Sequence, residues 1–180
     1  KDLDLYVVTG GNEFFDQMPE QFDRLYLNDG KGNFKRNLQA LPSMYDNKSV
    51  VRPCDFDQDG DMDLFVGGRV VAYHYGHSPR SYLLVNNGKG IFKDVTVQQA
   101  PNLRDAGMIT EAIWSDIDRD GDQDLTVVGD WMPIKMFINQ AGKLTELDND
   151  LKQFTGFWSG LTSGDFDRDG DIDFVVGNLG

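Results

Sequence analysis

The chain has 180 residues, and 39% of them are hydrophobic, so its composition is that of a folded domain rather than a disordered chain. The formal net charge is −13, but the excess is local: outside three Asp-rich loops and the residues Asp2 and Asp4, the sequence holds 13 acidic and 15 basic residues. No basic stripe remains to neutralise phosphates, which argues against nucleic acid as a partner. No apolar run reaches the roughly 18 residues of a membrane span, so we expect no transmembrane segment.

The chain begins inside a repeated motif. Residues 1–8 align with residues 60–67, so the N-terminus cuts an acidic loop, and we expect a fragment of a longer protein from which any signal peptide has been lost upstream. Corresponding Asp residues recur at offsets of 59, 61 and 49 positions: Asp2 to Asp61, Asp55 to Asp116, and Asp116 to Asp165. A period of about 50 to 60 residues with several short strands per unit predicts a repeat architecture.

Each unit has the same predicted order of elements. A β-branched or aromatic segment enters the Asp-rich loop and a second one leaves it; after a variable stretch, a third segment leads through a turn rich in Asn and Gly into a fourth. Asn and Gly supply the positive φ angles of tight hairpins, so the third and fourth strands are expected to pair. The expected entering strands are residues 49–52, 109–115 and 157–162, and the expected third strands are residues 24–27, 81–85 and 134–138.

Four antiparallel strands per unit are typical of a β-propeller blade. The sequence therefore predicts an all-β fold, a β-propeller segment of four-stranded antiparallel blades that amounts to about three blades. We expect one domain over residues 1–180, with an incomplete blade at 1–48, blades at 49–108 and 109–155, and an incomplete blade at 156–180. A propeller closes with roughly four to eight blades, so the strand edges at both ends are expected to pair with the remainder of a propeller or with another chain.

Three nine-residue loops, residues 55–63, 116–124 and 165–173, have Asp at positions 1, 3, 5, 7 and 9 and Gly at position 6. Side-chain oxygens at positions 1, 3 and 5 of such a loop converge on one point, the carbonyl of position 7 adds a ligand, and Gly permits the sharp turn that a hard cation requires. Position 9 is expected to close the site. About three Ca²⁺ sites are thus predicted, with these candidate ligands: Asp55, Asp57, Asp59, Asp61, Asp63, Asp116, Asp118, Asp120, Asp122, Asp124, Asp165, Asp167, Asp169, Asp171 and Asp173.

The rival interpretations of these loops are weaker. An EF-hand needs a Glu at position 12 and a helix on each side, whereas position 12 here is Val66, Val127 or Val176 within a predicted strand. Magnesium demands stricter octahedral geometry, and zinc prefers His or Cys ligands. Such loops fill best near millimolar calcium, so we expect an extracellular, cell-surface or periplasmic location. The single cysteine, Cys54, excludes an intramolecular disulfide and is expected to be a small buried hydrophobe.

The Asp-rich loops, the turn at residues 86–96, and the segments Gly-Asp-Trp-Met-Pro at 129–133 and Val-Gly-Asn-Leu-Gly at 176–180 resemble a known family. They are similar to the VCBS/FG-GAP repeats of integrin-alpha-like propellers, and in particular to the ASPIC/UnbV-associated proteins of bacterial cell surfaces. This resemblance covers essentially the whole chain and implies a calcium-binding propeller with seven blades in the complete ring. The chain departs from the pattern in its truncated first loop and in a third turn without the Asn-Gly core, and no integrin-type adhesion site can be placed.

In an up-and-down blade, the acidic loops and the Asn-Gly turns share one end of the sheet, and the remaining connections share the other end. Binding residues concentrate on loops held by a rigid scaffold, so we expect this second face to bind an unidentified protein or glycan. Its candidate residues are Phe14, Phe15, Tyr73, His74, Tyr75, His77, Arg80 and Trp131.

Simpler roles compete with binding for several of these residues. Two histidines without a third ligand in view are expected to be surface polar residues, and Phe14 and Phe15 to pin a long loop. Packing in the core or between blades is expected for the tryptophans, with stacking on sugars as the alternative: Trp114, Trp131 and Trp158. Two arginines at a non-ligand position of the acidic loops are expected to offset local negative charge: Arg119 and Arg168.

The favoured interpretation is a non-enzymatic calcium-binding repeat domain, with structural calcium and with loops that bind a partner outside the cell. The alternative is part of a polysaccharide-degrading enzyme, an activity that propellers of related repeat type can carry, with Glu111 or Asp130 as candidate acids. No paired general acid and base is evident outside the loops, which counts against this alternative. A third possibility is a spacer within a larger surface protein.

Overall fold

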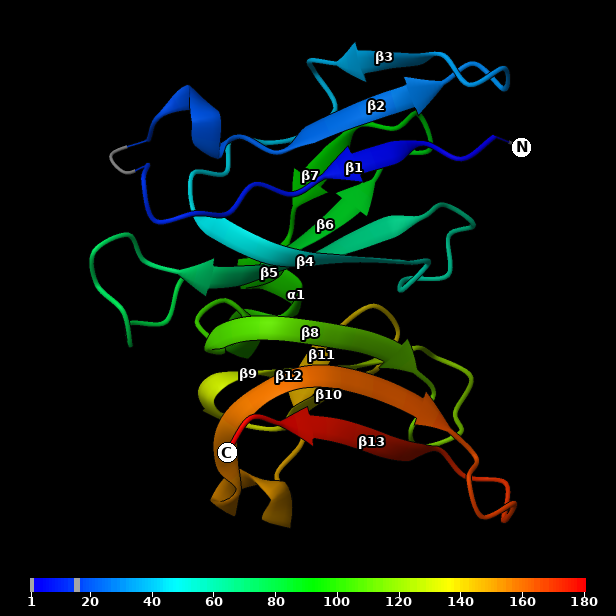
Figure 1. The fold of residues 1–180 in the computed structure, drawn as a ribbon. Coiled ribbons are helices and arrows are strands. Elements are labelled where there is room, and N and C mark those ends of the chain that lie inside the picture. The colour runs from blue at the N-terminus through cyan, green and yellow to red at the C-terminus, as the bar shows by residue number, and fades with distance from the viewer. Residues whose placement is uncertain (1, 15–16) are drawn as a thin grey trace.

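The computed structural model describes residues 2–14 and 17–180, and nearly all of its regular structure is β. The sheets are stacked from the N-terminal to the C-terminal one (Figure 1). The first contains β1 (Leu5–Val7), β2 (Arg24–Asn28) and β3 (Phe34–Asn37). The second contains β4 (Asn47–Cys54), β5 (Asp63–Val70), β6 (Tyr82–Asn86) and β7 (Phe92–Asp94). The third contains β8 (Met108–Ser115), β9 (Asp124–Pro133), β10 (Lys135–Asn139) and β11 (Leu144–Glu146). Then follow β12 (Thr155–Gly164) and β13 (Asp173–Asn178).

Within each sheet, sequential strands pair antiparallel, as in an up-and-down blade. The first sheet has three strands and the second has four, whereas β8 to β11 form a four-strand blade that β12 and β13 extend into one six-stranded sheet. The described strands form no closed barrel. The predicted fold, a partial β-propeller of four-stranded antiparallel blades, is confirmed. The bounds of the entering and third strands differ from the expected ones by at most two residues; β4 begins at Asn47 and β12 at Thr155.

The blades pack face to face because their middle strands are apolar on both sides. Along β5, successive side chains point to opposite faces of the sheet. Leu64 and Val66 pack in a cluster with Met44 on the side of the first blade, whereas Phe65 packs in a second cluster with Ile109 of the third blade. The run Leu-Phe-Val is therefore a strand buried on both faces, and the interface on either side of the second blade is a hydrophobic core.

The connection between the second and third blades also contributes to the core. It forms a short helix, α1 (Thr96–Gln99), and a 3-10 turn (Pro101–Leu103). Ala100 and Leu103 are fully buried in the cluster that joins the two blades. This connection is one of those expected at the second face, but the apolar residues at its centre pack inward. Further 3-10 turns lie at Pro19–Gln21 and Asp150–Gln153, and none of the described helical segments is long and apolar enough to cross a bilayer.

The third hairpin turn forms without an Asn-Gly pair. Ala141 and Gly142 both have positive φ angles, 52° and 82°, and Gln140 and Lys143 exchange backbone hydrogen bonds across the turn. Two central residues with positive φ define the tight turn that matches the twist of paired strands. The loss of the motif therefore shortens the turn but leaves the hairpin in place.

Strand pairing between β9 and β12 joins the last two blades. The beginning of β12 pairs with the end of β9 before β12 continues alongside β13: Thr155, Gly156 and Phe157 lie opposite Pro133, Met132 and Asp130. The register shifts between Gly156 and Phe157, and Trp131 is left without a partner in the ladder. This is a β-bulge, which redirects a side chain and bends the strand.

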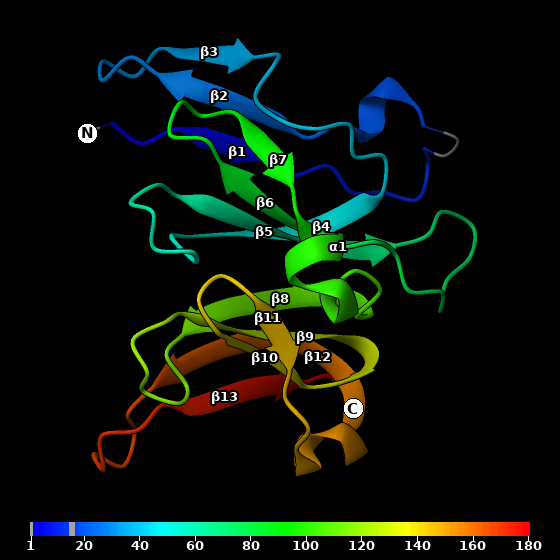
Figure 2. The same ribbon diagram turned by 180° about the vertical axis from the view of Figure 1, so that it is seen from behind.

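The connections lie at two ends of the blades (Figures 1 and 2). The acidic loops between β4 and β5, β8 and β9, and β12 and β13 are at one end, and the connections from β5 to β6 and from β9 to β10 are at the other. The arrangement of faces expected from alternating connections is therefore present.

Candidate metal centre

The three acidic loops share one backbone conformation. Position 4 has a left-handed φ in each, with values of 60° at Gln58, 64° at Arg119 and 67° at Arg168. The glycine at position 6 also has positive φ, between 92° and 96°, a conformation that glycine adopts without steric cost. Its N–H donates to the position 1 carboxylate at 3.1 Å in every loop. The sequence repeat is thus a repeat of local structure.

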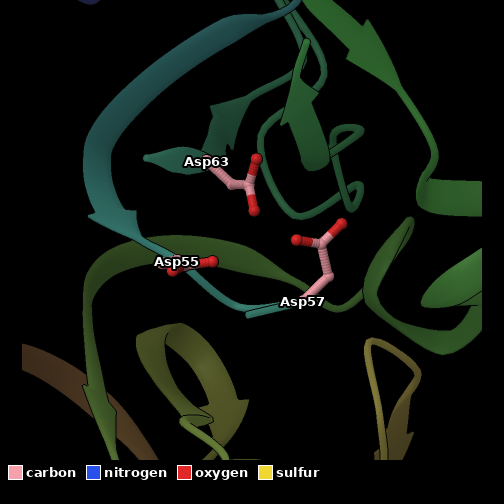
Figure 3. Close-up of side chains that lie close together, drawn as sticks. All are labelled: Asp55, Asp57 and Asp63. Atoms are coloured by element: carbon pink, nitrogen blue, oxygen red, sulfur yellow. The ribbon is translucent and has the colours of Figure 1, made fainter. Parts of the chain in front are cut away.

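This conformation brings the carboxylates of positions 1, 3 and 9 together. In each loop, ligand oxygens from these three residues lie within 4.8 Å of one another. Figure 3 shows the first cluster, in which Asp63 at the start of β5 faces Asp55 and Asp57 across the loop. The clusters are Asp55, Asp57 and Asp63; Asp116, Asp118 and Asp124; and Asp165, Asp167 and Asp173.

The acids at positions 5 and 7 lie outside these clusters. At position 5, the carboxylate accepts a hydrogen bond from the N–H of position 7, at 2.8 to 3.0 Å. At position 7, the predicted ligand is the backbone carbonyl, and the side chains of Asp122 and Asp171 contact position 4 of the preceding loop. Ligation by all of the predicted residues stays a prediction; these acids lie outside the clusters: Asp59, Asp120, Asp169, Asp61, Asp122 and Asp171.

The position 9 carboxylate also fixes the sheet, a role that sequence reasoning missed. Its Oδ1 accepts the backbone N–H of the Asn that ends the third strand: Asn86 donates to Asp63 at 2.8 Å, and Asn139 donates to Asp124 at 2.7 Å. The first repeat has the same bond, from Asn28 to Asp4 at 2.9 Å. The side-chain amide of each Asn donates to the carbonyl of position 8. The signal in the sequence is the Asn found at this point in every unit.

Burial and mutual repulsion act on these acids. Asp63 is 1% exposed, and burial, together with the charges of Asp57 and Asp59, raises its pKa to about 6. Burial also raises the pKa of Asp57 and of Asp124 above their ordinary values. Four buried carboxylate oxygens of the first two loops accept no hydrogen bond from the described residues: Asp55 Oδ1, Asp57 Oδ1, Asp63 Oδ2 and Asp116 Oδ1.

Buried polar atoms are normally paired, so unpaired oxygens that converge on one point fit a cation as the missing partner. The donor set consists of oxygen alone, which suits a hard ion such as calcium. The third loop has the same geometry, but Asp165 and Asp167 are exposed.

Successive loops are linked through position 4. Gln58 Nε2 of the first loop donates to Asp122 Oδ1 and to the Gly121 carbonyl of the second loop, at 2.7 and 3.1 Å. Arg119, at the equivalent position of the second loop, forms an ion pair with Asp171 of the third loop at 3.6 Å. Position 4 therefore contacts the next blade, a more specific role than the expected offset of local charge.

The two candidate acids of the enzymatic alternative both form ion pairs with arginines of the preceding blade. Glu111 Oε1 accepts from Arg52 Nη2 at 2.5 Å, and Asp130 Oδ2 accepts from Arg69 Nη2 at 2.7 Å. These contacts tie the second blade to the third.

Of the remaining candidate residues, some are packed in the interior and others are exposed at the surface. His74 and His77 are exposed and stack at 5.5 Å, and the metal-competent clusters of the described residues include neither. Cys54 is buried as expected, and burial raises its pKa to about 12. Phe14 is half-buried, whereas Phe15, like Lys1, lies outside the described residues.

The tryptophans also differ from one another. Trp114 and Trp158 are partly buried, and each indole N–H donates to a carbonyl of the preceding blade, Arg52 at 3.1 Å and Met132 at 2.9 Å. Packing between blades is thus confirmed for these two. Trp131, which is 64% exposed, departs from that expectation.

Comparison with known proteins agrees with the repeat architecture. No curated protein matches the sequence. A family model described as an FG-GAP-like repeat matches residues 1–66 and 116–176, which include all three acidic loops. The narrower similarity to ASPIC/UnbV-associated proteins stays a prediction. Because the matched regions cover more than half of its length, the chain belongs to the FG-GAP-like repeat family.

Proposed function

We propose that this propeller segment is a non-enzymatic calcium-binding domain in which the ions hold the corners of the blades. The observation that carries the proposal is the convergence of three carboxylates, several with buried and unpaired oxygens, at the same corner of successive blades. Each cluster joins the end of an entering strand to the start of the next strand through positions 1 and 9. A bound Ca²⁺ would supply the positive charge and the oxygen coordination that these acids lack.

The proposed calcium is structural. With dissociation constants of about 0.1 to 1 mM, typical of extracellular modules, and calcium at about 1 mM, each site stabilises the fold by about 0.4 to 1.4 kcal/mol. Three sites together are a sizeable fraction of the marginal stability of a domain, which is about 5 to 15 kcal/mol.

The same reasoning places the domain where calcium is abundant: outside the cell, on its surface, or in a periplasm. There, the loops opposite the acidic face are free to bind a protein or a glycan. The exposed strand edges of the first and last sheets are suited to pairing with further blades or with another chain.

Thermal unfolding with and without calcium tests the proposal. The melting temperature is expected to rise in millimolar calcium relative to chelator, with little response to the same concentration of magnesium, and titration calorimetry should give about three ions per chain. Asp116→Asn is expected to remove one ion from the stoichiometry. Asp105→Asn is the matched control, because Asp105 is exposed and lies outside the acidic loops.

Equal melting temperatures in calcium and chelator would refute the proposal. So would an unchanged stoichiometry in Asp116→Asn, since the ions would then bind elsewhere on the acidic surface.

A further inference from the structure

Large aromatic side chains are exposed on the face opposite the acidic loops: Tyr73, Tyr75 and Trp131. Trp131, at the end of β9, is 64% exposed. Its indole is not used to anchor a neighbouring blade in the way that Trp114 and Trp158 are. Burial of a tryptophan is strongly favourable, so an exposed one at a rigid site calls for an explanation.

The backbone holds Trp131 outward at a cost. Its φ is 57°, in the left-handed region that bulky residues rarely adopt. It is also the bulged residue that the pairing of β9 with β12 skips. Such strain persists only where the surrounding structure imposes it, and it is frequent at binding sites.

Neighbouring rings fix the orientation of the indole. Tyr75, from the connection between β5 and β6, meets Trp131 edge to face at 6.4 Å between ring centroids, and Phe157 of β12 does so at 5.5 Å. The Tyr75 hydroxyl donates to Asp130 Oδ2 at 2.9 Å, and Arg69 pairs with the same oxygen at 2.7 Å. Residues from three blades thus present one aromatic platform with polar groups beside it.

A hollow lies on either side of Trp131. One, of about 320 Å³, is bordered by Phe157, Thr155 and Asn178. The other, of about 250 Å³, is bordered by Asp130 and Lys135. Both are near or below the lower end of the roughly 300 to 1,000 Å³ typical of small-molecule sites, a size suited to single rings of a chain rather than to one large ligand.

The charges around the platform are balanced. Arg69 pairs with Asp130, and Lys135 pairs with Glu146 at 3.8 Å. The site therefore offers donors and acceptors without a net charge that would select an anion or a cation. A flat aromatic face bordered by such groups is complementary to a pyranose, which has an apolar ring face and hydroxyls at its rim.

We propose that Trp131 and Tyr75 form a binding site for a neutral glycan, with one pyranose stacked on the indole and its hydroxyls bound by polar side chains that border the two hollows, Thr155, Asn178 and Lys135. The partly buried Arg69–Asp130 pair holds the Tyr75 hydroxyl in place. This inference rests on the proposed function, because it names the class of partner for the face that the calcium-stabilised blades present. The stacking contact carries the affinity, and the polar side chains of the hollows determine which hydroxyl arrangement is accepted.

The test is binding of soluble cellulose-, mannan-, xylan- and starch-derived oligosaccharides to the whole chain in millimolar calcium, followed by calorimetry and by iodide quenching of tryptophan fluorescence. At least one saccharide is expected to bind and to protect the exposed indole from iodide. Trp131→Ala is expected to weaken binding about 10- to 30-fold, and Trp131→Phe less. Phe34→Ala is the matched control, since Phe34 is a half-exposed aromatic of β3 in the first blade.

Absence of binding to every one of these saccharides would overturn the inference, as would equal affinity in Trp131→Ala and the unmodified chain. The calcium-dependent melting temperature is measured on the same samples. A chain that calcium stabilises but no saccharide binds would contradict the glycan site alone, whereas a chain indifferent to calcium would contradict the proposed function.

Discussion

The carboxylate at position 9 of the first two acidic loops performs two functions that conflict in the absence of a cation. Asp63 receives the N–H of Asn86 and so fixes the start of β5 against the end of β6. It is also buried beside Asp57, so its negative charge is costly. A proton or a divalent ion relieves this cost, and the two must compete for the same oxygens.

The stability of the metal-free chain is therefore expected to depend on pH. Because the pKa of Asp63 is raised to about 6 in the folded state, its contribution is most favourable below the ordinary carboxyl pKa of about 4 and is lost as the pH rises through about 6. In chelator, lowering the pH from about 7 to about 5 should raise the free energy of unfolding by about 1 to 2 kcal/mol. Asp57 and Asp124, whose pKa values are also raised, act in the same direction.

Denaturant unfolding at several pH values, in chelator and in calcium, measures this effect. The increment due to calcium should shrink toward pH 5, because protons displace the ion. Asp63→Asn keeps an acceptor for Asn86 but cannot ionise, so its dependence on pH in chelator should be weaker, whereas Asp105→Asn should behave like the unmodified chain. Stability in chelator that rises with pH over this range would contradict the assignment.

At the scale of elements, the acidic loops form a connected series. Position 4 of one loop contacts position 7 of the next, in Gln58 with Asp122 and in Arg119 with Asp171. The first contact is short and includes a second bond to a backbone carbonyl. The second joins two side chains that are more than half exposed, and such ion pairs contribute little. The link from the first loop to the second is thus the stronger of the two.

Gln58→Asn is expected to weaken calcium binding by the second loop more than by the loop that contains the substitution. Asn tolerates the left-handed φ of position 4 but is one methylene too short to reach Asp122, so the change removes the link without adding strain. We expect the affinity of the second loop to fall by about two- to tenfold, the equivalent of one ordinary hydrogen bond. The amide resonances of Gly60, Gly121 and Gly170 report each loop separately in a calcium titration, because each N–H donates to a cluster carboxylate.

Arg168→Ala, at the same position of the third loop, is the control and should leave the titration of Gly121 unchanged. A loss of affinity confined to Gly60 would mean that position 4 acts only within its own loop.

Much at this scale follows from the sequence. The repeated loops and apolar runs predict the blades, because Leu64, Phe65 and Val66 can be buried together only in a strand covered on both faces. The convergence of positions 1, 3 and 9 follows from the spacing of Asp55, Asp57 and Asp63 around a glycine.

The features that the sequence did not predict depend on contacts between distant residues. From its neighbours in the sequence, Asn86 is expected to be only a turn residue. Its bond to the buried Asp63 forms only when the strands pair. The outward position of Trp131 depends on a bulge created where β9 meets β12 of the next blade. Periodicity within one segment carries no information on either.

At the scale of the whole molecule, corresponding residues join successive blades. The hydroxyl of Ser49 donates to the Ile109 carbonyl, and that of Thr110 donates to the Trp158 carbonyl, both at 2.6 Å. At the junction of the first and second blades, a buried lysine makes the connecting hydrogen bonds instead. Lys48 of β4 donates to the carbonyls of Gln21 and Met44 at 3.1 Å.

The same lysine lies 3.4 Å from Asp23, and both side chains are fully buried. Burial lowers the pKa of Lys48 and raises that of Asp23, while their attraction opposes both shifts. A buried ion pair is costly to form but far more costly to break, since one removed partner leaves the other charge without compensation.

Lys48→Met is therefore expected to detach the first blade while the others stay folded. The substitution leaves the Asp23 charge and two carbonyls unpaired, at a cost of about 3 to 5 kcal/mol. Because the second and third blades share a separate hydrophobic cluster, the loss should appear as faster amide hydrogen exchange in β1, β2 and β3 and little change in β8 and β9. Lys48→Met with Asp23→Asn should recover part of the protection, since no buried charge then remains. Equal acceleration in all blades would instead show that the chain unfolds as one cooperative unit and that the buried pair stabilises the whole stack rather than a single junction.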